Sequence, residues 1–222
     1  MLRRFAVLLF SAFLLPAAFA QKDSCSSQPQ PTSSTADLEE GTNEFGVWAG
    51  YSPTSPHGIG VSSDRQLFLL NGSYARVIHT TKTVAIKYTV DIVPVALITQ
   101  PAETFLTNSG TLISHNAQTV YGGGMNPIGF QFNFRRGHKW QPFANAHGGF
   151  LYFTQQVPVI DSSQYNFTFS FGGGVQVFSG DRSSFSLGYR YYHLSNANTG
   201  DRNPGVDANL FYGAFTVFKR RK

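Results

Sequence analysis

Three residues near the C-terminal end of this 222-residue chain carry the side chains needed to hydrolyse an ester: His193, Ser195 and Asp207. An imidazole can take the proton of a serine hydroxyl, while a carboxylate fixes the imidazole tautomer and stabilises the imidazolium ion. The serine oxygen then attacks an acyl carbonyl. The side-chain amide of Asn203 and backbone N–H groups near Gly205 could hold the developing oxyanion. Together these residue types indicate acyl transfer to a serine.

The spacing of these residues places them on an unusual surface. His193 and Ser195 are separated by one residue, so in a β-strand they point to the same side. Bulky side chains share that side of the two segments, namely Phe185, Leu187, Tyr189 and Tyr191 with His193, and Phe211, Phe215 and Val217 with Asp207. Polar groups on a lipid-facing surface are costly without a function. Interfacial residues that only bind headgroups would have the same spacing, so spacing alone leaves both interpretations open.

The elements that must position these residues are β-strands. From Phe45 onward apolar and polar residues alternate with period two, which is typical of strands with two different faces. The clearest runs are 84–93, 128–135, 165–177 and 184–191, and less regular ones lie at 45–52, 65–78, 139–153 and 208–218. No helical pattern of comparable strength is present. The sequence therefore predicts eight strands.

The composition indicates which face of these strands is buried. Aromatic residues make up 15% of the chain and charged residues only 13%, yet the mean hydropathy is −0.15. The polar face consists of small uncharged residues, whereas a water-facing surface normally carries many more Lys and Glu residues. Both features are explained if the bulky face meets lipid and the small polar face fills the lumen of a barrel.

The connections between the predicted strands alternate in length. The links at 53–64, 96–117, 155–164 and 196–206 are long, and those at 79–82, 136–139 and 179–182 are short. Outer-membrane barrels have short periplasmic turns and longer extracellular loops in this alternation. We therefore predict an all-β fold, an eight-stranded antiparallel transmembrane outer-membrane β-barrel, with His193 at the height of the outer leaflet. A soluble lipocalin-like barrel is disfavoured by the charge-poor small-residue face.

The N-terminal region predicts export. Arg3 and Arg4 precede an apolar run that ends in an Ala-x-Ala site at Ala18 and Ala20, the pattern of a cleaved signal peptide. We expect a signal peptide over 1–20, a flexible Ser/Thr/Pro-rich leader over 21–44 and the outer-membrane barrel domain over 45–222, ending in a short basic tail. The predicted location is the outer membrane of a diderm bacterium.

Several other classes of function are excluded or disfavoured. The single cysteine, Cys25, excludes an intramolecular disulfide framework and cysteine-based zinc sites. A net charge of +5 on the full chain gives no basic footprint for nucleic acid. The loop histidines lack metal-ligand spacing, so we expect no metal site. We expect the polar residues on the small face to form a hydrogen-bonded lumen: Lys87, Asp91, Arg135, Asn145, His147 and Asn166.

The segment around the candidate residues resembles a known family. It reads His193-Leu194-Ser195-Asn196-Ala197 and then Asn203-Pro204-Gly205-Val206-Asp207. The lipid A 3-O-deacylases (PagL type, also called acyloxyacyl hydrolases) have a strand ending in His-x-Ser-Asn-Ala, followed by Asn-Pro-Gly-x-acid before the last strand. The similarity is strong over 185–218 and only architectural elsewhere.

This resemblance implies an outer-membrane barrel that removes the ester-linked 3-hydroxyacyl chain at position 3 of lipid A, without metal or cofactor. It also implies roles by position: Ser195 is the nucleophile, His193 the general base and Asp207 the acid of the triad. Asn203 and Gly205 fall at the oxyanion positions of the family.

Some features stay open at this stage. The family commonly has Glu where this chain has Asp207, so the shorter carboxylate must approach the histidine more closely. Arg202, in the same loop, is a candidate contact for the phosphates of lipid A in the outer leaflet. The sequence does not decide whether the barrel forms a homodimer. The alternative function is a non-catalytic barrel of the OmpA or adhesin type.

Overall fold

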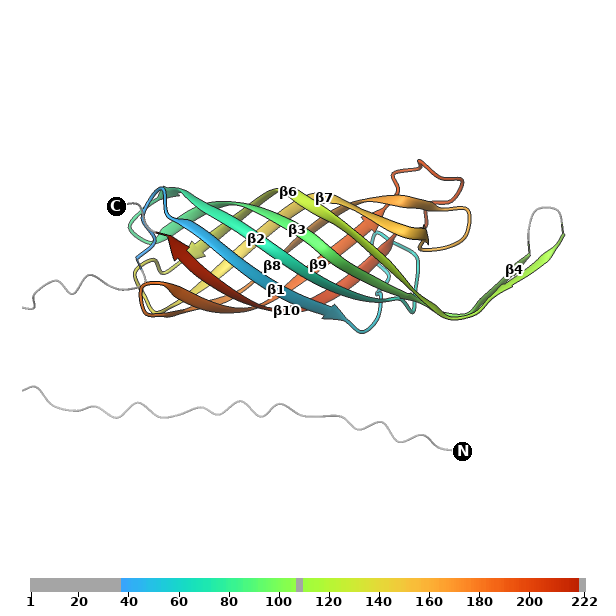
Figure 1. Cartoon of the computed structure of the whole chain (residues 1–222), viewed down its shortest axis with the longest axis horizontal. Coiled ribbons are helices and arrows are strands. Elements are labelled where there is room, and N and C mark those ends of the chain that lie inside the picture. Colours follow the sequence, from blue (N-terminus) through green and yellow to red (C-terminus); the bar gives the residue numbers. More distant parts are fainter. Residues whose placement is uncertain (1–36, 107–109, 220–222) are drawn as a thin grey trace, which may run out of the picture. The chain divides into compact units, whose positions relative to one another are not determined.

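Eight strands form a closed barrel in the computed structural model, which describes residues 37–106 and 110–219 (Figure 1). They are β1 (Asn43–Ser52), β2 (Gln66–Thr80), β3 (Val84–Gln100), β6 (Gln118–Phe134), β7 (Trp140–Val157), β8 (Ser163–Ser179), β9 (Ser183–Ser195) and β10 (Val206–Lys219). Neighbouring strands are antiparallel, and β1 pairs with β10 to close the barrel. The predicted eight-stranded antiparallel barrel is confirmed. Within the described residues, no helix is both long and apolar enough to cross a membrane.

The connection between β3 and β6 differs from the sequence prediction. It carries a small hairpin, β4 (Glu103–Leu106) and β5 (Leu112–His115), which projects beyond the barrel (Figure 1). In addition, β6 starts at Gln118 rather than near residue 128. The glycines at 122–124 hide this part of β6 in the sequence because they interrupt the alternation. They permit close strand contact, since a Cβ on Gly124 would collide with the carbonyl oxygen of Phe150 on β7.

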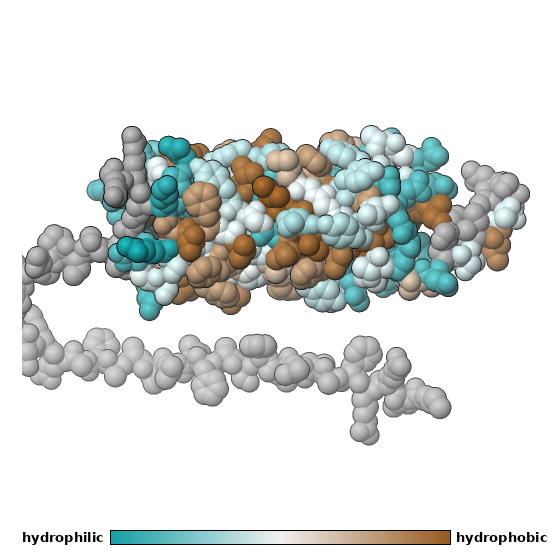
Figure 2. Space-filling view, viewed as in Figure 1, coloured by the Kyte–Doolittle hydropathy of each residue, from teal (hydrophilic) through white to brown (hydrophobic). Residues whose placement is uncertain are grey.

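The bulky face of the strands points outward. Leu187 and Phe211 are each 61% exposed, whereas the side chains that alternate with them, such as Ser186 and Leu210, are buried. Figure 2 shows hydrophobic residues around the middle of the visible face and hydrophilic residues gathered toward its two ends. A closed barrel satisfies its backbone hydrogen bonds internally and can therefore present such a band to lipid.

Polar and charged side chains fill the lumen. Lys87 Nζ lies 2.7 Å from Glu44 Oε1 as an ion pair, and it donates a hydrogen bond of 3.0 Å to Gln176 Oε1. Arg190 and Asp91 form a second buried pair at 3.4 Å. Five of the six expected lumenal residues are buried, namely Lys87, Asp91, Asn145, His147 and Asn166.

Arg135 is the exception among the expected lumenal residues. It follows the end of β6 with a φ of 57°, and its guanidinium stacks 3.6 Å from the ring centre of the exposed Trp140. Because Arg135 has this left-handed conformation, β6 and its alternation of faces end at Phe134, one residue before the end of the run 128–135 that the sequence predicts. The expectation for Arg135 was therefore wrong, because a turn residue does not inherit the face of the preceding strand.

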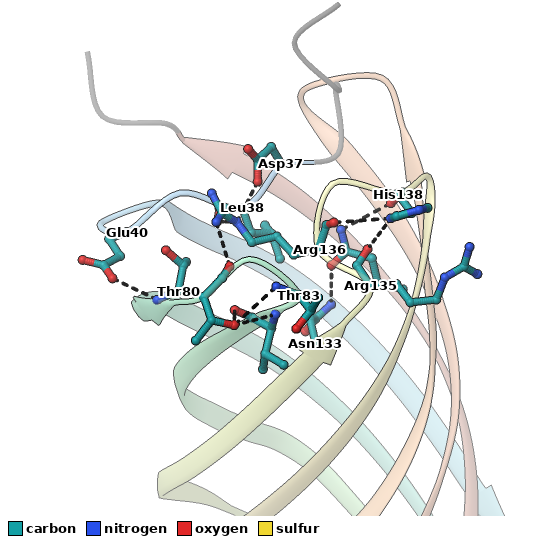
Figure 3. Close-up of polar contacts among 12 residues, drawn as sticks. Asp37, Leu38, Glu40, Thr80, Thr83, Asn133, Arg135, Arg136 and His138 are labelled. Atoms are coloured by element: carbon teal, nitrogen blue, oxygen red, sulfur yellow. Dashed lines mark hydrogen bonds and ion pairs between the residues drawn. The ribbon is translucent and has the colours of Figure 1, made fainter. Parts of the chain in front are cut away.

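The end of the barrel with the short turns is closed by the chain that leads into β1 (Figure 3). Leu38 is only 2% exposed and packs with Val77, Ala85 and Phe178. Arg136 Nε donates to the carbonyl oxygen of Leu38 at 2.9 Å and pairs with Asp37 Oδ1 at 2.7 Å. The folded domain thus includes residues that precede the expected boundary at 45. The expected signal peptide and most of the leader, residues 1–36, lie outside the described residues, as do residues 220–222.

Candidate active site

The strand register brings His193 and Asp207 together. They are direct cross-strand partners on β9 and β10, and His193 Nδ1 lies 2.6 Å from Asp207 Oδ1. A carboxylate only accepts hydrogen bonds, so in the neutral imidazole the proton belongs to Nδ1 and Nε2 carries the free lone pair. Asp207 is 0% exposed and His193 is 6% exposed. The pair therefore has the tautomer that a general base requires.

This pair lies on the outer wall of the barrel near the long loops. The His193 ring centre is 5.0 Å from that of Phe169, an outward-facing residue of β8. His193 also continues the outward alternation of Phe185, Leu187 and Tyr189 along β9. Its low exposure comes from Phe169 and from Gly205, where an added Cβ would lie 3.1 Å from His193 Cε1, since the side chain does not turn into the lumen.

A second loop, which connects β1 to β2 and spans residues 53–65, contacts Asp207 and the backbone at Pro204 and Gly205. The Gly60 N–H donates to Asp207 Oδ2 at 2.9 Å, and the Val61 N–H donates to the carbonyl oxygen of Pro204 at 2.7 Å. The Ser62 N–H reaches the carbonyl oxygen of Gly205 at 3.3 Å. No motif in the sequence predicted that this loop belongs to the site. The two glycines in Gly58-Ile59-Gly60 indicate a close backbone approach, but they do not indicate that the contact is with Asp207, 147 residues away from Gly60.

Ser195 is the last residue of β9 and lies two positions beyond His193 on the same face. Its side chain is half-buried, and its cross-strand partner on β8 is Phe167. Among the described residues, no hydrogen bond joins Ser195 to His193. Hydrogen bonds between a nucleophile and its base are often long in unliganded enzymes and tighten when substrate binds. The structure therefore joins two of the three predicted triad residues and places the third beside them.

The loop after Ser195, residues 196–205, is held by Asn196. The Asn196 N–H donates to Asn203 Oδ1 at 3.1 Å, and its buried side-chain amide donates to Ser162 Oγ at 3.0 Å and to the Arg202 carbonyl oxygen at 2.8 Å. Its Oδ1 accepts the N–H of Asn198 at 2.9 Å. Asn196 was part of the recognised motif, but the sequence analysis gave it no role.

The two predicted oxyanion residues lie in this loop. Gly205 has a φ of 62° and packs against the imidazole, so that a Cβ there would lie 3.1 Å from His193 Cε1. In the part of the chain that the structure describes, the Gly205 N–H makes no hydrogen bond. The Asn203 amide donates to Asn198 Oδ1 at 3.3 Å. Arg202 has an exposed side chain, and its N–H is anchored to the Asp161 carbonyl oxygen at 2.9 Å.

An apolar groove of about 260 Å³ lies on the outer wall next to the site. Its walls include Ile128 and Phe130 of β6 and Phe169 and Phe171 of β8, and Gly148 of β7 lies between them. A Cβ added to Gly148 would meet nothing within 4 Å, so the groove is open at this position. Phe169 lines the groove and also contacts His193, so a single side chain lies between the groove and the histidine. No group of His, Cys, Asp and Glu side chains suited to a metal ion occurs within 37–106 and 110–219.

A closed eight-stranded barrel with a lipid-facing outer wall and a His–Asp pair on that wall defines an outer-membrane barrel with an enzyme-like site. The profile of the family described as "Lipid A 3-O-deacylase (PagL)" matches residues 88–216. The chain belongs to this family, as the resemblance of its motif indicated. The match includes His193, Ser195 and Asp207.

The chain is similar to several solved structures, of which the first supports the fold. The crystal structure of the outer membrane enzyme PagL is 18% identical, with a TM-score of 0.55, over 76% of this chain and 97% of that one. Neisserial surface protein A is 15% identical, with a TM-score of 0.49, over 80% of this chain and 99% of that one. OprG from Pseudomonas aeruginosa is 9% identical, with a TM-score of 0.48, over 84% and 99%. No curated protein sequence matches the chain.

Proposed function

We propose that this lipid A 3-O-deacylase family member hydrolyses the ester of the 3-hydroxyacyl chain at position 3 of lipid A through a Ser195–His193–Asp207 triad. The observation that carries the proposal is the 2.6 Å contact between His193 Nδ1 and Asp207 Oδ1 on the outer wall. It leaves Nε2 as the basic nitrogen, on the face that also bears Ser195. An ester buried among acyl chains can be reached from such a wall.

The reaction proceeds in two acyl-transfer steps. His193 Nε2 takes the hydroxyl proton as Ser195 Oγ attacks the ester carbonyl carbon, and Asp207 stabilises the imidazolium ion. The C–O bond to the sugar then breaks, and His193 returns the proton to the leaving 3-hydroxyl group. In the second step His193 deprotonates a water molecule that attacks the acyl-serine. This releases a 3-hydroxy fatty acid and regenerates Ser195.

The loop 196–205 supplies charge stabilisation. The Gly205 N–H, which has no other hydrogen bond within the described residues, and the Asn203 amide serve as donors to the tetrahedral oxyanion. One such donor is worth about 3–4 kcal/mol of transition-state stabilisation in other acyl-transfer enzymes.

The surroundings of the site fit a lipid substrate with a charged headgroup. The apolar groove beside Phe169 accepts an acyl chain without desolvating polar groups. The exposed Arg202 can pair with a phosphate of lipid A. The signal peptide over 1–20 would deliver the chain to the periplasm, from which the barrel inserts into the outer membrane. No cofactor takes part in these steps.

Mass spectrometry of lipid A tests the proposal. Cells that produce the wild-type protein should lose one 3-hydroxyacyl chain from lipid A, and cells that produce Ser195→Ala should retain it. Thr168→Ala, which changes a hydroxyl inside the lumen, is the matched control and should behave as wild type. Identical acylation in wild-type and Ser195→Ala cells, with equal amounts of folded barrel, would instead support a non-catalytic barrel.

A further inference from the structure

The two carboxylate oxygens of Asp207 are held from opposite sides. Oδ1 accepts the hydrogen bond from His193, and Oδ2 accepts the Gly60 N–H at 2.9 Å. The Tyr191 hydroxyl accepts the Ile59 N–H at 3.3 Å. Gly60 and Ile59 both belong to the segment Gly58–Val61, which we call the strap.

The strap fits against the site because its inner positions are glycines. A Cβ on Gly58 would lie 2.7 Å from Asp207 Oδ2 and 2.8 Å from the Tyr191 hydroxyl oxygen. A Cβ on Gly60 would lie 2.8 Å from the carbonyl carbon of Gly205. The intervening Ile59 and the following Val61 are each 64% exposed and point away from the site. Only hydrogen atoms fit between the strap and the carboxylate.

A short side chain makes this support necessary. The aspartate has one methylene group, so its carboxylate reaches the imidazole only from the directly opposite cross-strand position. Rotation about the bond to the carboxylate would replace Oδ1 by Oδ2 or tilt the plane of the group away from Nδ1. The Gly60 N–H on Oδ2 opposes this rotation, because a turned carboxylate would lose that hydrogen bond. The Tyr191 hydroxyl holds the strap in place through Ile59.

We propose that the strap and the Tyr191 hydroxyl are positioning elements that hold Asp207 in the orientation required by His193. This inference rests on the proposed triad, because an orienting carboxylate matters for rate only if His193 acts as the base. The strap lies far in the chain from the motif that contains His193, Ser195 and Asp207. It contributes the backbone N–H of Gly60, which a motif of side chains does not reveal.

Kinetics of Tyr191→Phe and Gly58→Ala test the proposal. Both should lower kcat about 10- to 100-fold with little change in KM, as expected for a displaced catalytic group. In an Asp207→Asn background Tyr191→Phe should add no further loss, because its effect passes through the carboxylate. Tyr189→Phe, which removes a hydroxyl bonded to Asn209 on the same outer face, and Gly72→Ala, which has open space around its Cβ, are the matched controls. Additive effects of Tyr191→Phe and Asp207→Asn would overturn the proposal.

A proton NMR signal separates this inference from the proposed function. In the detergent-solubilised full-length barrel with labelled histidine, the Nδ1 proton of His193 should give a far-downfield signal in wild type, Tyr189→Phe and Ser195→Ala. The signal should broaden or shift in Tyr191→Phe. Because this variant does not depend on the folding of Gly58→Ala, the test stays valid if Gly58→Ala does not fold. An unchanged signal in both Tyr191→Phe and Gly58→Ala would refute the positioning role of Tyr191 and the strap. Full activity in Ser195→Ala would refute the nucleophile while leaving the NMR result in place.

Discussion

His193 and Asp207 lie 14 residues apart in the chain, yet their side chains meet at 2.6 Å because the β9–β10 register makes them direct partners. The intervening loop does not bring the two side chains together. It connects the two strands and carries the oxyanion candidates. A shift of the register by one residue would turn Asp207 into the lumen. The site therefore depends on the register of the β9–β10 pair within the barrel.

Asp207→Asn should abolish most of the activity without unfolding the barrel. The amide keeps the size of the side chain but can donate to Nδ1, which favours the proton on Nε2 and removes the base. We expect kcat to fall about 10³- to 10⁴-fold, as in a serine hydrolase with the same substitution. Rates measured on purified lipid A in detergent micelles check this. Activity near wild type in a correctly folded variant would remove Asp207 from the mechanism.

Asn196→Ala should loosen the loop that carries Asn203 and Gly205. The substitution removes the side-chain contacts to Ser162 and to the Arg202 carbonyl oxygen, so the oxyanion donors lose their fixed position. We expect kcat/KM to fall at least about tenfold. Asn198→Gly, which removes the side-chain bond of 3.3 Å to Asn203 and suits the φ of 63° at this position, is the control and should have a smaller effect. Equal rates for the two variants would argue against Asn196 as the anchor.

Gly148→Leu should reduce activity according to acyl-chain length. The new side chain enters the open floor of the apolar groove, so it competes with the distal part of a long acyl chain. We expect kcat/KM for a long-chain ester to fall about tenfold while a short-chain ester is little affected. Gly72→Leu, at an open position on β2, should change neither rate. A uniform loss for both chain lengths would show that the groove does not select the substrate.

Lys87→Met should destabilise the barrel without affecting the site. It leaves the buried Glu44 carboxylate without its cation, which costs about 3–5 kcal/mol in buried pairs. The double variant Lys87→Met/Glu44→Gln should regain most of that stability, and the exposed Lys82→Met should change little. Denaturant unfolding in detergent measures all three. A double variant as unstable as the single would show that the loss comes from packing and not from the unpaired charge.

The strand count and the two faces of the barrel could be predicted because they depend on local alternation. Phe185, Leu187 and Tyr189 identify the outer face from sequence alone, and so do Ile128, Phe130 and Phe132. The His193–Asp207 contact was predictable because both residues lie at the ends of adjacent strands joined by one loop.

The features that escaped the sequence analysis depend on contacts between distant segments. Gly60 reaches Asp207 through a backbone N–H, a group that every non-proline residue has, so its residue type carries no signal. Leu38 stands alone in a polar stretch, and only the surrounding Val77, Ala85 and Phe178 give it a buried place. The start of β6 was hidden by glycines whose function is close strand packing.

The filled lumen and the position of the candidate site on the outer wall together determine the route by which a lipid substrate reaches the site. Lys87, Gln176 and Arg190 occupy the interior, so neither substrate nor product passes through the barrel. In the proposed reaction, an ester that meets Ser195 on the outer wall arrives by lateral diffusion within one leaflet, and the released chain returns to that leaflet. The encounter rate then follows the number of substrate molecules per unit area of membrane rather than their number per unit volume. Catalysis by this barrel is a two-dimensional process.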